Sequence, residues 1–223
     1  MIMPCLYAIA DAEFLAARGV ALADFAQELR AAGVGLVQYR NKNGTPQEVL
    51  RGAAILRKAM TGSDCKLLLN DRADLAVLAG FDGVHVGQGD LSPEDAKAVL
   101  RVAAPTHREE QGHDERGAGL VGVSTHTDEQ VRIAEQSSAD YVAIGPVFAT
   151  GTKADAAPVV GLEGVRRARA LTRKPLVAIG GLTLANARSV IDAGANSVAI
   201  ISGLLTPDTS TEQLARDFLR VLR

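Results

Sequence analysis

The stretch PLVAIGGLTLANARSVIDAGANSVAIISG, residues 175–203, decides the fold. It begins with a short β-rich run at 175–180, continues through a helical pattern that starts at Leu184, and returns to a β-rich run at 197–202. Thr183 stands where a helix N-cap is expected, and Gly194 stands where a left-handed residue ends a helix. A strand, a helix and a second strand in immediate succession predict two parallel strands joined by a right-handed crossover.

The same unit recurs along the whole chain. Apolar residues between the β-rich runs follow helical spacing, and Ser92 and Thr127 are further predicted N-caps. The remaining β-rich runs lie at 5–10, 35–40, 66–70, 83–87, 120–125 and 141–147. Eight strands alternating with eight helices predict an α/β fold, a (β/α)₈ TIM barrel that occupies residues 1–223 as a single domain. An open doubly wound sheet would instead place glycines after its first strand, where this chain has ADAEF at 10–14.

Composition narrows the class of protein. The 24 basic and 26 acidic residues give a net charge of −2, which argues against a general nucleic-acid surface. No segment approaches the roughly 20 apolar residues that cross a bilayer, and the N-terminus lacks the pattern of a secretory signal. A soluble cytoplasmic protein is therefore expected, with Cys5 and Cys65 packed as buried thiols. The polar stretch at 105–119 is interpreted as a surface insertion on the N-terminal rim of the barrel.

Polar side chains gather at the end of the second predicted strand. Gln38 and Arg40 lie on one strand face, and Lys42 continues that line into the loop. An amide, a guanidinium and an ammonium together suit the oxygens of a phosphate group. A solvated basic turn is the alternative, although Gln38 and Arg40 inside an apolar strand require an anion or a carboxylate partner.

Two carboxylates follow the third and fourth predicted strands. Asp71 and Asp90 at one barrel mouth would suit Mg²⁺, whose coordination substrate phosphate and water would complete. The alternative is that each caps the helix or turn that follows it. His85 is interpreted as a packed strand residue, and His126 lies near enough to the mouth to contact a substrate.

The later strand ends carry a second set of groups. Thr150, Thr152 and Lys153 stand in a Gly-rich loop that could close over a substrate, although an exposed lysine in such a loop often has no function. The glycines at 180–181 and the ISG at 201–203 stand where barrel proteins frequently bind phosphate.

Taken together, these motifs resemble thiamine-phosphate synthases over nearly the whole chain. The family's Q-x-R-x-K, N-D, H-x-G-Q-x-D, G-x-S and T-x-T-K motifs have counterparts here in QYRNK at 38–42, ND at 70–71, HVGQGD at 85–90, GVS at 122–124 and TGTK at 150–153. The resemblance implies that Asp71 and Asp90 hold Mg²⁺. It also implies two sets of substrate-binding residues. The pyrimidine diphosphate set is Gln38, Arg40, Lys42, Asn70, Ser124 and Lys153, and the thiazole phosphate set is Thr150, Thr152, Gly181, Ile201 and Ser202.

The family reaction joins 4-amino-2-methyl-5-hydroxymethylpyrimidine diphosphate to 4-methyl-5-(2-phosphooxyethyl)thiazole and releases pyrophosphate. By resemblance its mechanism is dissociative, and Arg40, Lys42 and Lys153 would stabilise the departing diphosphate. A related thiazole tautomerase and a non-catalytic thiazole phosphate-binding regulator are the alternatives. The tautomerase would not need the two aspartates, and His126 is the residue that favours it.

Two features depart from the family pattern. Ala149 replaces the proline that commonly precedes the first threonine of the loop, so we expect a less restrained loop. The insertion at 105–119 is also longer than expected. Barrels of this size often pair, so the sequence leaves room for a homo-oligomer without indicating an interface.

Overall fold

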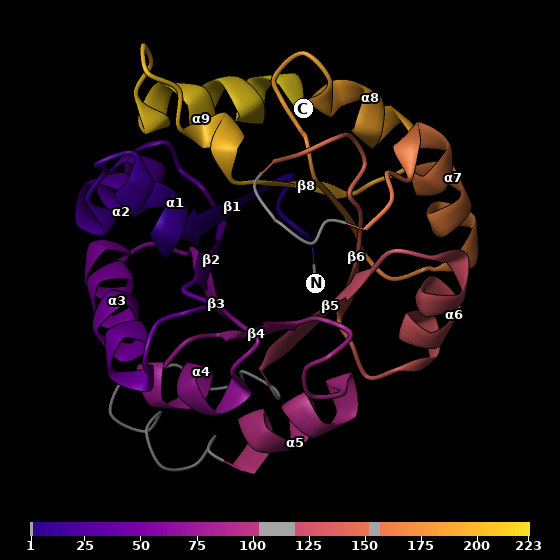
Figure 1. The fold of residues 1–223 in the computed structure, drawn as a ribbon, viewed down its shortest axis with the longest axis horizontal. Helices are drawn as coiled ribbons and strands as arrows, with labels where there is room; N and C mark the ends of the chain where they lie inside the picture. Colours follow the sequence, from indigo (N-terminus) through magenta and orange to yellow (C-terminus); the bar gives the residue numbers. More distant parts are fainter. Residues whose placement is uncertain (1, 103–118, 152–156) are drawn as a thin grey trace.

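The eight β-rich runs form eight parallel strands, each paired with the next along the chain, and β8 closes the barrel on β1. This computed structural model describes residues 2–102, 119–151 and 157–223. The strands are β1 (Leu6–Asp11), β2 (Leu36–Arg40), β3 (Lys66–Asn70), β4 (Gly83–Val86), β5 (Leu120–Thr125), β6 (Tyr141–Ile144), β7 (Leu176–Ile179) and β8 (Ser197–Ile200). Figure 1 shows the ring of strands inside a ring of helices. The predicted (β/α)₈ barrel is confirmed.

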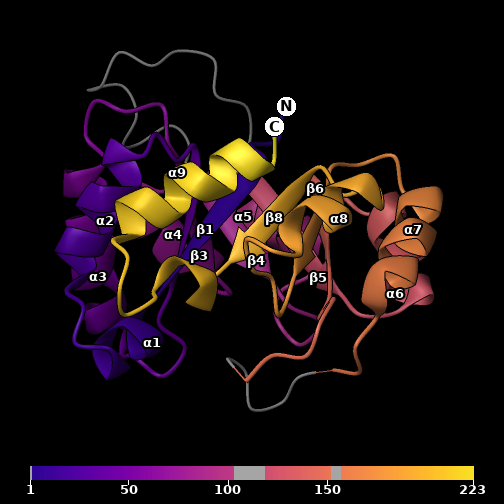
Figure 2. The ribbon, with the colours of Figure 1, turned by 90° about the horizontal axis from the view of Figure 1, so that it is seen from above.

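Helices cover the outside of the barrel, and the described residues contain one more α-helix than expected together with a short 3₁₀ helix. They are α1 (Ala12–Ala17), α2 (Leu22–Ala31), α3 (Pro46–Ala59), α4 (Ala73–Ala79), α5 (Pro93–Val102), α6 (Asp128–Gln136), α7 (Gly161–Leu171), α8 (Ala187–Asp192), α9 (Thr211–Val221) and the short 3₁₀ helix η2 (Ser202–Leu204). The extra helix is α1, which starts directly where β1 stops. In Figure 2 it lies at the opposite end of the barrel from the C-terminus. None of the helices in the described ranges has the length and apolar character of a membrane span.

Helix starts follow the predicted caps in two cases out of three. The Ser92 hydroxyl accepts the Asp95 N–H at 3.1 Å, and the Thr127 hydroxyl accepts the Gln130 N–H at 3.2 Å. The prediction for Thr183 is wrong, because α8 begins only at Ala187. The Asn186 side chain accepts the Thr183 N–H at 2.7 Å, so a closed turn occupies the place of the first helical turn.

Strand alternation divides the core into two layers. Val37 and Tyr39 of β2 pack outward with the helices, whereas Leu36 points inward with Leu68, Tyr141 and other residues of the barrel interior. The interior layer also holds the buried side chain of Gln38. The Gln38 side chain of β2 therefore faces the barrel interior, as the alternation of the strand predicts.

A repeated side-chain clamp fixes the N-terminal rim. Asp82, Asp140 and Asn196 precede β4, β6 and β8, and each side-chain oxygen accepts a backbone N–H from the preceding strand at 2.7–2.9 Å. The backbone N–H of each of these residues returns a bond to the same strand at 2.7–2.8 Å. The clamps hold strands in register in pairs, β3 with β4, β5 with β6 and β7 with β8.

We expect Asp140→Ala to lower the free energy of unfolding by about 3 kcal/mol, because it leaves a buried cation with the Gly119 carbonyl but without its carboxylate partner. Lys97, which is 8% exposed, donates to the Asp140 carboxylate at 2.5 Å. Urea denaturation measures the change. As a control, Asp192→Ala breaks an exposed pair with Arg188 and should change stability by less than about 0.5 kcal/mol. Equal losses in the two variants would contradict the clamp.

Candidate active site

Arg40 ends β2 at the mouth of the barrel and forms an ion pair with Asp11, its neighbour at the end of β1. The Asp11 side chain is 4% exposed, and it also accepts the Phe14 N–H at 2.9 Å as the N-cap of α1. One carboxylate therefore starts a helix and holds the guanidinium. Arg40 is not part of a solvated turn, whereas Lys42 in the following loop is exposed. Arg40 was predicted to need an anion or a carboxylate as partner, and Asp11, which was not among the predicted residues, is that partner.

Asp71 and Asp90 follow β3 and β4 and come close enough for Asp90 to act on the ionisation of Asp71. Burial, followed by the charge and the hydrogen bond of Asp90, raises the pKa of Asp71 to about 6, although Lys42 and Arg40 oppose this shift. The two predicted metal ligands therefore lie within electrostatic reach of two predicted diphosphate ligands.

Helix capping accounts for neither of these aspartates, although Asp90 stabilises a turn. Asp71 has a left-handed backbone with φ of 64°, and the N-cap of α4 is Arg72, which makes no side-chain cap. Asp90 does stabilise a turn, since its carboxylate accepts the Gly87 N–H at 2.7 Å. A left-handed aspartate that caps nothing is the kind of backbone conformation often found at functional sites.

A chain of hydrogen bonds crosses the barrel interior below the mouth. Gln38 Nε2 donates to the Tyr7 hydroxyl at 2.6 Å, and that hydroxyl lies 2.9 Å from the Tyr141 hydroxyl. Tyr141 lies 2.8 Å from His85 Nδ1, and His85 Nε2 lies 2.8 Å from the Ser124 hydroxyl. Two predicted ligands on different strands, Gln38 and Ser124, are thereby linked. Neither tyrosine was among the predicted site residues, and His85, which was predicted only to pack, is hydrogen-bonded through both ring nitrogens.

The residues predicted to bind the thiazole phosphate lie on loops that contact one another at the other side of the mouth. A Cβ on Gly181 would lie 2.5 Å from the Ala149 carbonyl oxygen, so only glycine allows this approach. A Cβ on Gly203 would lie 3.1 Å from the Leu182 carbonyl oxygen, which places the loop after β8 against the loop after β7. Ile201 is buried, and Ser202 begins η2.

The loop after β6 is described as far as Gly151. The Phe148 N–H bonds the Gly180 carbonyl at 3.0 Å, and Thr150 is half-buried. Thr152 and Lys153 lie outside the described residues, as does nearly all of the insertion predicted at 105–119. The effect of Ala149 on the loop stays a prediction.

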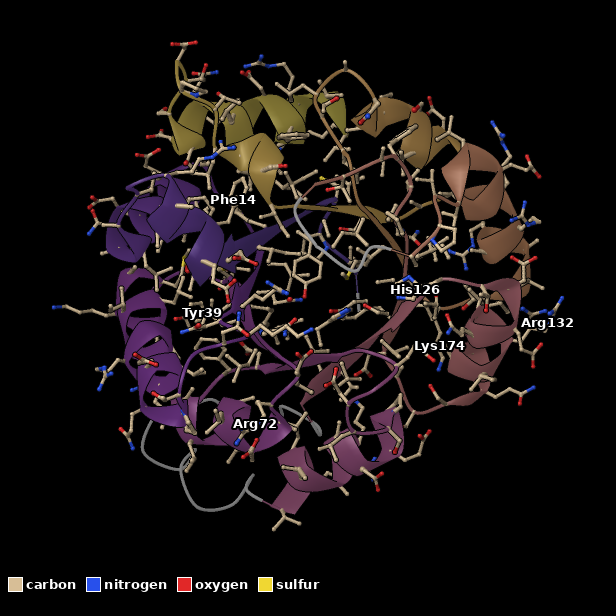
Figure 3. The ribbon with its side chains drawn as sticks, in the orientation of Figure 1. Phe14, Tyr39, Arg72, His126, Arg132 and Lys174 are labelled. Carbon is tan, nitrogen blue, oxygen red and sulfur yellow. The ribbon has the colours of Figure 1, made fainter. Side chains whose placement is uncertain are left out.

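The remaining predicted residues also lie at the mouth. Asn70 ends β3, half-buried, and is paired in register with His85. His126 Nδ1 lies 2.6 Å from the Gly145 carbonyl, which leaves Nε2 as an acceptor. Figure 3 shows His126 on the inner side of the ring, whereas Arg132 points out from α6.

The donor set suits a metal that is shared with a substrate. Among residues 2–102, 119–151 and 157–223, no three His, Cys, Asp or Glu side chains gather as a complete metal site. Asp71 and Asp90 supply two carboxylates that repel each other, and a divalent cation would relieve that repulsion. Mg²⁺ is commonly held by one or two carboxylates together with substrate phosphates, so the residues present fit it.

A parallel barrel with cations, carboxylates and close-approach glycines at its carboxyl rim is typical of (β/α)₈-barrel proteins that act on phosphate-bearing ligands. Residues 6–204 match the family described as thiamine monophosphate synthase. The chain belongs to this family.

Individual relatives agree with this membership. The thiamine-phosphate synthase of Koribacter versatilis is 50% identical over 222 residues, which are 99% of this chain and 96% of that protein. The synthase of Methanospirillum hungatei is 38% identical and covers 92% of this chain and 93% of its own length. A solved thiamine phosphate pyrophosphorylase from Pyrococcus furiosus superposes with a TM-score of 0.80 at 27% identity, covering 97% of this chain and 94% of that one.

Proposed function

We propose that this protein joins the hydroxymethylpyrimidine group of a pyrimidine diphosphate to a thiazole phosphate, forming thiamine phosphate and pyrophosphate. The observation that carries the proposal is the cluster of Arg40, Lys42, Asp71 and Asp90, in which two cations and two carboxylates act on one another. A diphosphate between the cations and a metal on the carboxylates would neutralise both sets. The synthase names of relatives that match nearly the full chain support the same reaction.

Separation of charge is the main chemical demand of the reaction. As the diphosphate leaves, negative charge concentrates on its oxygens, so fixed cations favour the transition state over the bound reactant. Arg40 is oriented by Asp11, which leaves its other N–H groups for a ligand. Lys42 and, by family resemblance, Lys153 would add point charges, and no nucleophilic side chain is required.

Mg²⁺ bound by Asp71 and Asp90 would supply Lewis-acid stabilisation of the leaving diphosphate. The thiazole phosphate would bind on the opposite side of the mouth. Backbone groups there approach closely at Gly181, and the half-buried Ser202 begins the short helix η2. This separation keeps the leaving group and the incoming phosphate on different strand ends.

A two-substrate assay tests the proposal. We expect pyrophosphate release only when the pyrimidine diphosphate, the thiazole phosphate and Mg²⁺ are all present, together with thiamine phosphate detected by mass spectrometry. Isomerised thiazole without pyrophosphate would instead identify a tautomerase. Thiazole phosphate binding without any product would identify a regulator, and either result would refute the synthase proposal.

A further inference from the structure

The hydrogen bonds inside the barrel form a chain with one direction. Gln38 donates through Nε2, so the Tyr7 hydroxyl is an acceptor there and its own proton is directed to Tyr141. Tyr141 then donates to His85 Nδ1, which places the imidazole proton on Nε2. His85 Nε2–H donates to Ser124, and the serine hydroxyl proton remains for a ligand. Each donor choice fixes the next one.

The side chains that form this hydrogen-bond chain are too buried to exchange their hydrogen-bond partners freely. Gln38 is 3% exposed, Tyr7 and Tyr141 are each 1% exposed, and His85 is 9% exposed. Burial raises the pKa of both phenols, so each hydroxyl keeps its proton. A buried polar group without a partner is destabilising, so reversal at one bond would require reversal along the whole chain.

The absence of a side chain at Gly122 makes room for the Tyr141 ring in this hydrogen-bond chain. Gly122 of β5 pairs with Tyr141 of β6, and a Cβ on Gly122 would lie 1.9 Å from Cζ of the Tyr141 ring. The ring therefore occupies the space of the missing side chain. It stacks on the His85 ring at a centroid distance of 5.6 Å and meets Tyr7 edge to face at 6.0 Å.

We propose that Tyr7 and Tyr141 are positioning residues that act through this directed chain. They turn the Gln38 carbonyl oxygen toward the mouth as an acceptor and keep the Ser124 hydroxyl as a donor. An aminopyrimidine offers an amino group to donate and ring nitrogens to accept, so the pair is matched to that class of ligand. The proposal rests on the proposed function for the identity of the ligand, but it predicts which ring nitrogen of His85 carries the proton whatever the ligand is.

The kinetic test uses Tyr7→Phe and Tyr141→Phe, which remove one hydroxyl each and keep the ring. We expect the KM for the pyrimidine diphosphate to rise roughly tenfold in each variant, because an oriented hydrogen bond to the ligand is lost. The KM for the thiazole phosphate should stay within about twofold, because the chain does not reach the Gly181 side of the mouth. A purely structural role would change both constants together.

Tyr39→Phe is the matched control. The chain has three tyrosines, and Tyr39 is also buried, but its ring packs on the outer face of β2 against α3. Its hydroxyl contacts Asn41 at 3.4 Å, away from the barrel interior. Both KM values should match those of the parent protein.

A double-mutant cycle tests whether Tyr7 affects Ser124 through the hydrogen-bond chain. Tyr7 and Ser124 are separated by Tyr141 and His85, so independent roles would give multiplied effects on the pyrimidine KM. We expect the double variant to fall clearly short of the product of the two single effects, because with Ser124→Ala present Tyr7→Phe can still disturb Gln38 but has no serine donor left to disturb. Multiplied effects would overturn the proposal.

The final test reads the His85 ring without any substrate. In ¹⁵N NMR of the full-length protein, with His85→Gln used to assign the signals, we expect a protonated Nε2 and an unprotonated Nδ1. A proton on Nδ1 would mean that the chain runs the other way, and the proposal would fail. If the parent protein makes no thiamine phosphate, the proposed function fails, while the ring nitrogens still decide the direction of the chain.

Discussion

Asp71→Asn is expected to stabilise the ligand-free protein while lowering its turnover about a hundredfold or more, because an amide removes one carboxylate of the proposed metal pair. The Asp71 pKa is raised to about 6 by burial and by Asp90, so its carboxylate is unfavourable in the folded protein at neutral pH. Asparagine tolerates the left-handed backbone at φ of 64°, so the substitution does not strain the chain. Alanine would lack that tolerance.

The pH dependence of the stability gain has a definite sign. The folded protein binds the Asp71 proton more tightly than the unfolded chain, whose ordinary pKa is 3.8. Stability contributed by this proton is therefore complete below pH 3.8 and is lost as the pH rises to about 6. Asp71→Asn should raise the free energy of unfolding by about 1 kcal/mol above this window, after allowance for the partial exposure of the side chain, and by almost nothing below it.

Asp74→Asn is the matched control for this experiment. Asp74 lies three residues further on, exposed in the first turn of α4, and its hydrogen bond to Arg72 lowers its pKa. We expect a slight loss of stability at neutral pH and unchanged turnover. Urea denaturation across the pH range and pyrophosphate release measure the two properties. If Asp71→Asn turns over like the parent protein, Asp71 is not a metal ligand.

The barrel and the predicted strand ends could be read from sequence because their signals are local. The run GLVQYR at 35–40 alternates inward and outward residues, so Gln38 and Arg40 follow directly from strand periodicity. Each predicted ligand also belongs to a short motif at a strand end. These features require no knowledge of which other strand lies opposite.

The missed residues depend on contacts that only the closed barrel creates. Tyr7 and Tyr141 stand in LYAIAD and YVAI, where a tyrosine is normally a packing residue, and they are 134 positions apart. Asp11 ends the first strand as Arg40 ends the second, so this pair could have been predicted from the pairing of adjacent strands. Asp140 gave no signal, because a surface aspartate before a strand is common.

Arg40→Lys is expected to lower kcat about a hundredfold, although it keeps the charge, because the guanidinium supplies donors that an ammonium cannot. Asp11 engages Nη1 of Arg40 and fixes the plane of the group, so the remaining N–H groups are pre-oriented for the leaving diphosphate. A lysine at this position can donate to Asp11 or to a phosphate oxygen, but it lacks the planar set of N–H groups that can bind both at once.

Two companion variants separate orientation from charge. Asp11→Asn retains the N-cap of α1, because asparagine is also a good cap, but it weakens the hold on Arg40, so its loss of kcat should be smaller. Arg188→Lys alters an exposed arginine paired with Asp192 on α8 and should leave kcat unchanged. Single-turnover measurement of pyrophosphate release isolates the chemical step from product release.

The relative effects of Arg40→Lys and Asp11→Asn on kcat distinguish a role of charge from a role of orientation. If Arg40 acts by its charge alone, Arg40→Lys retains nearly full kcat, and Asp11→Asn increases rather than reduces it, because a competing anion has been removed. If Arg40 acts as an oriented fork, both variants lose kcat and Arg40→Lys loses more. Since Asp11 is 4% exposed and lies next to Arg40 in register, we expect the second order, with Asp11 holding Arg40 in place to receive the leaving group.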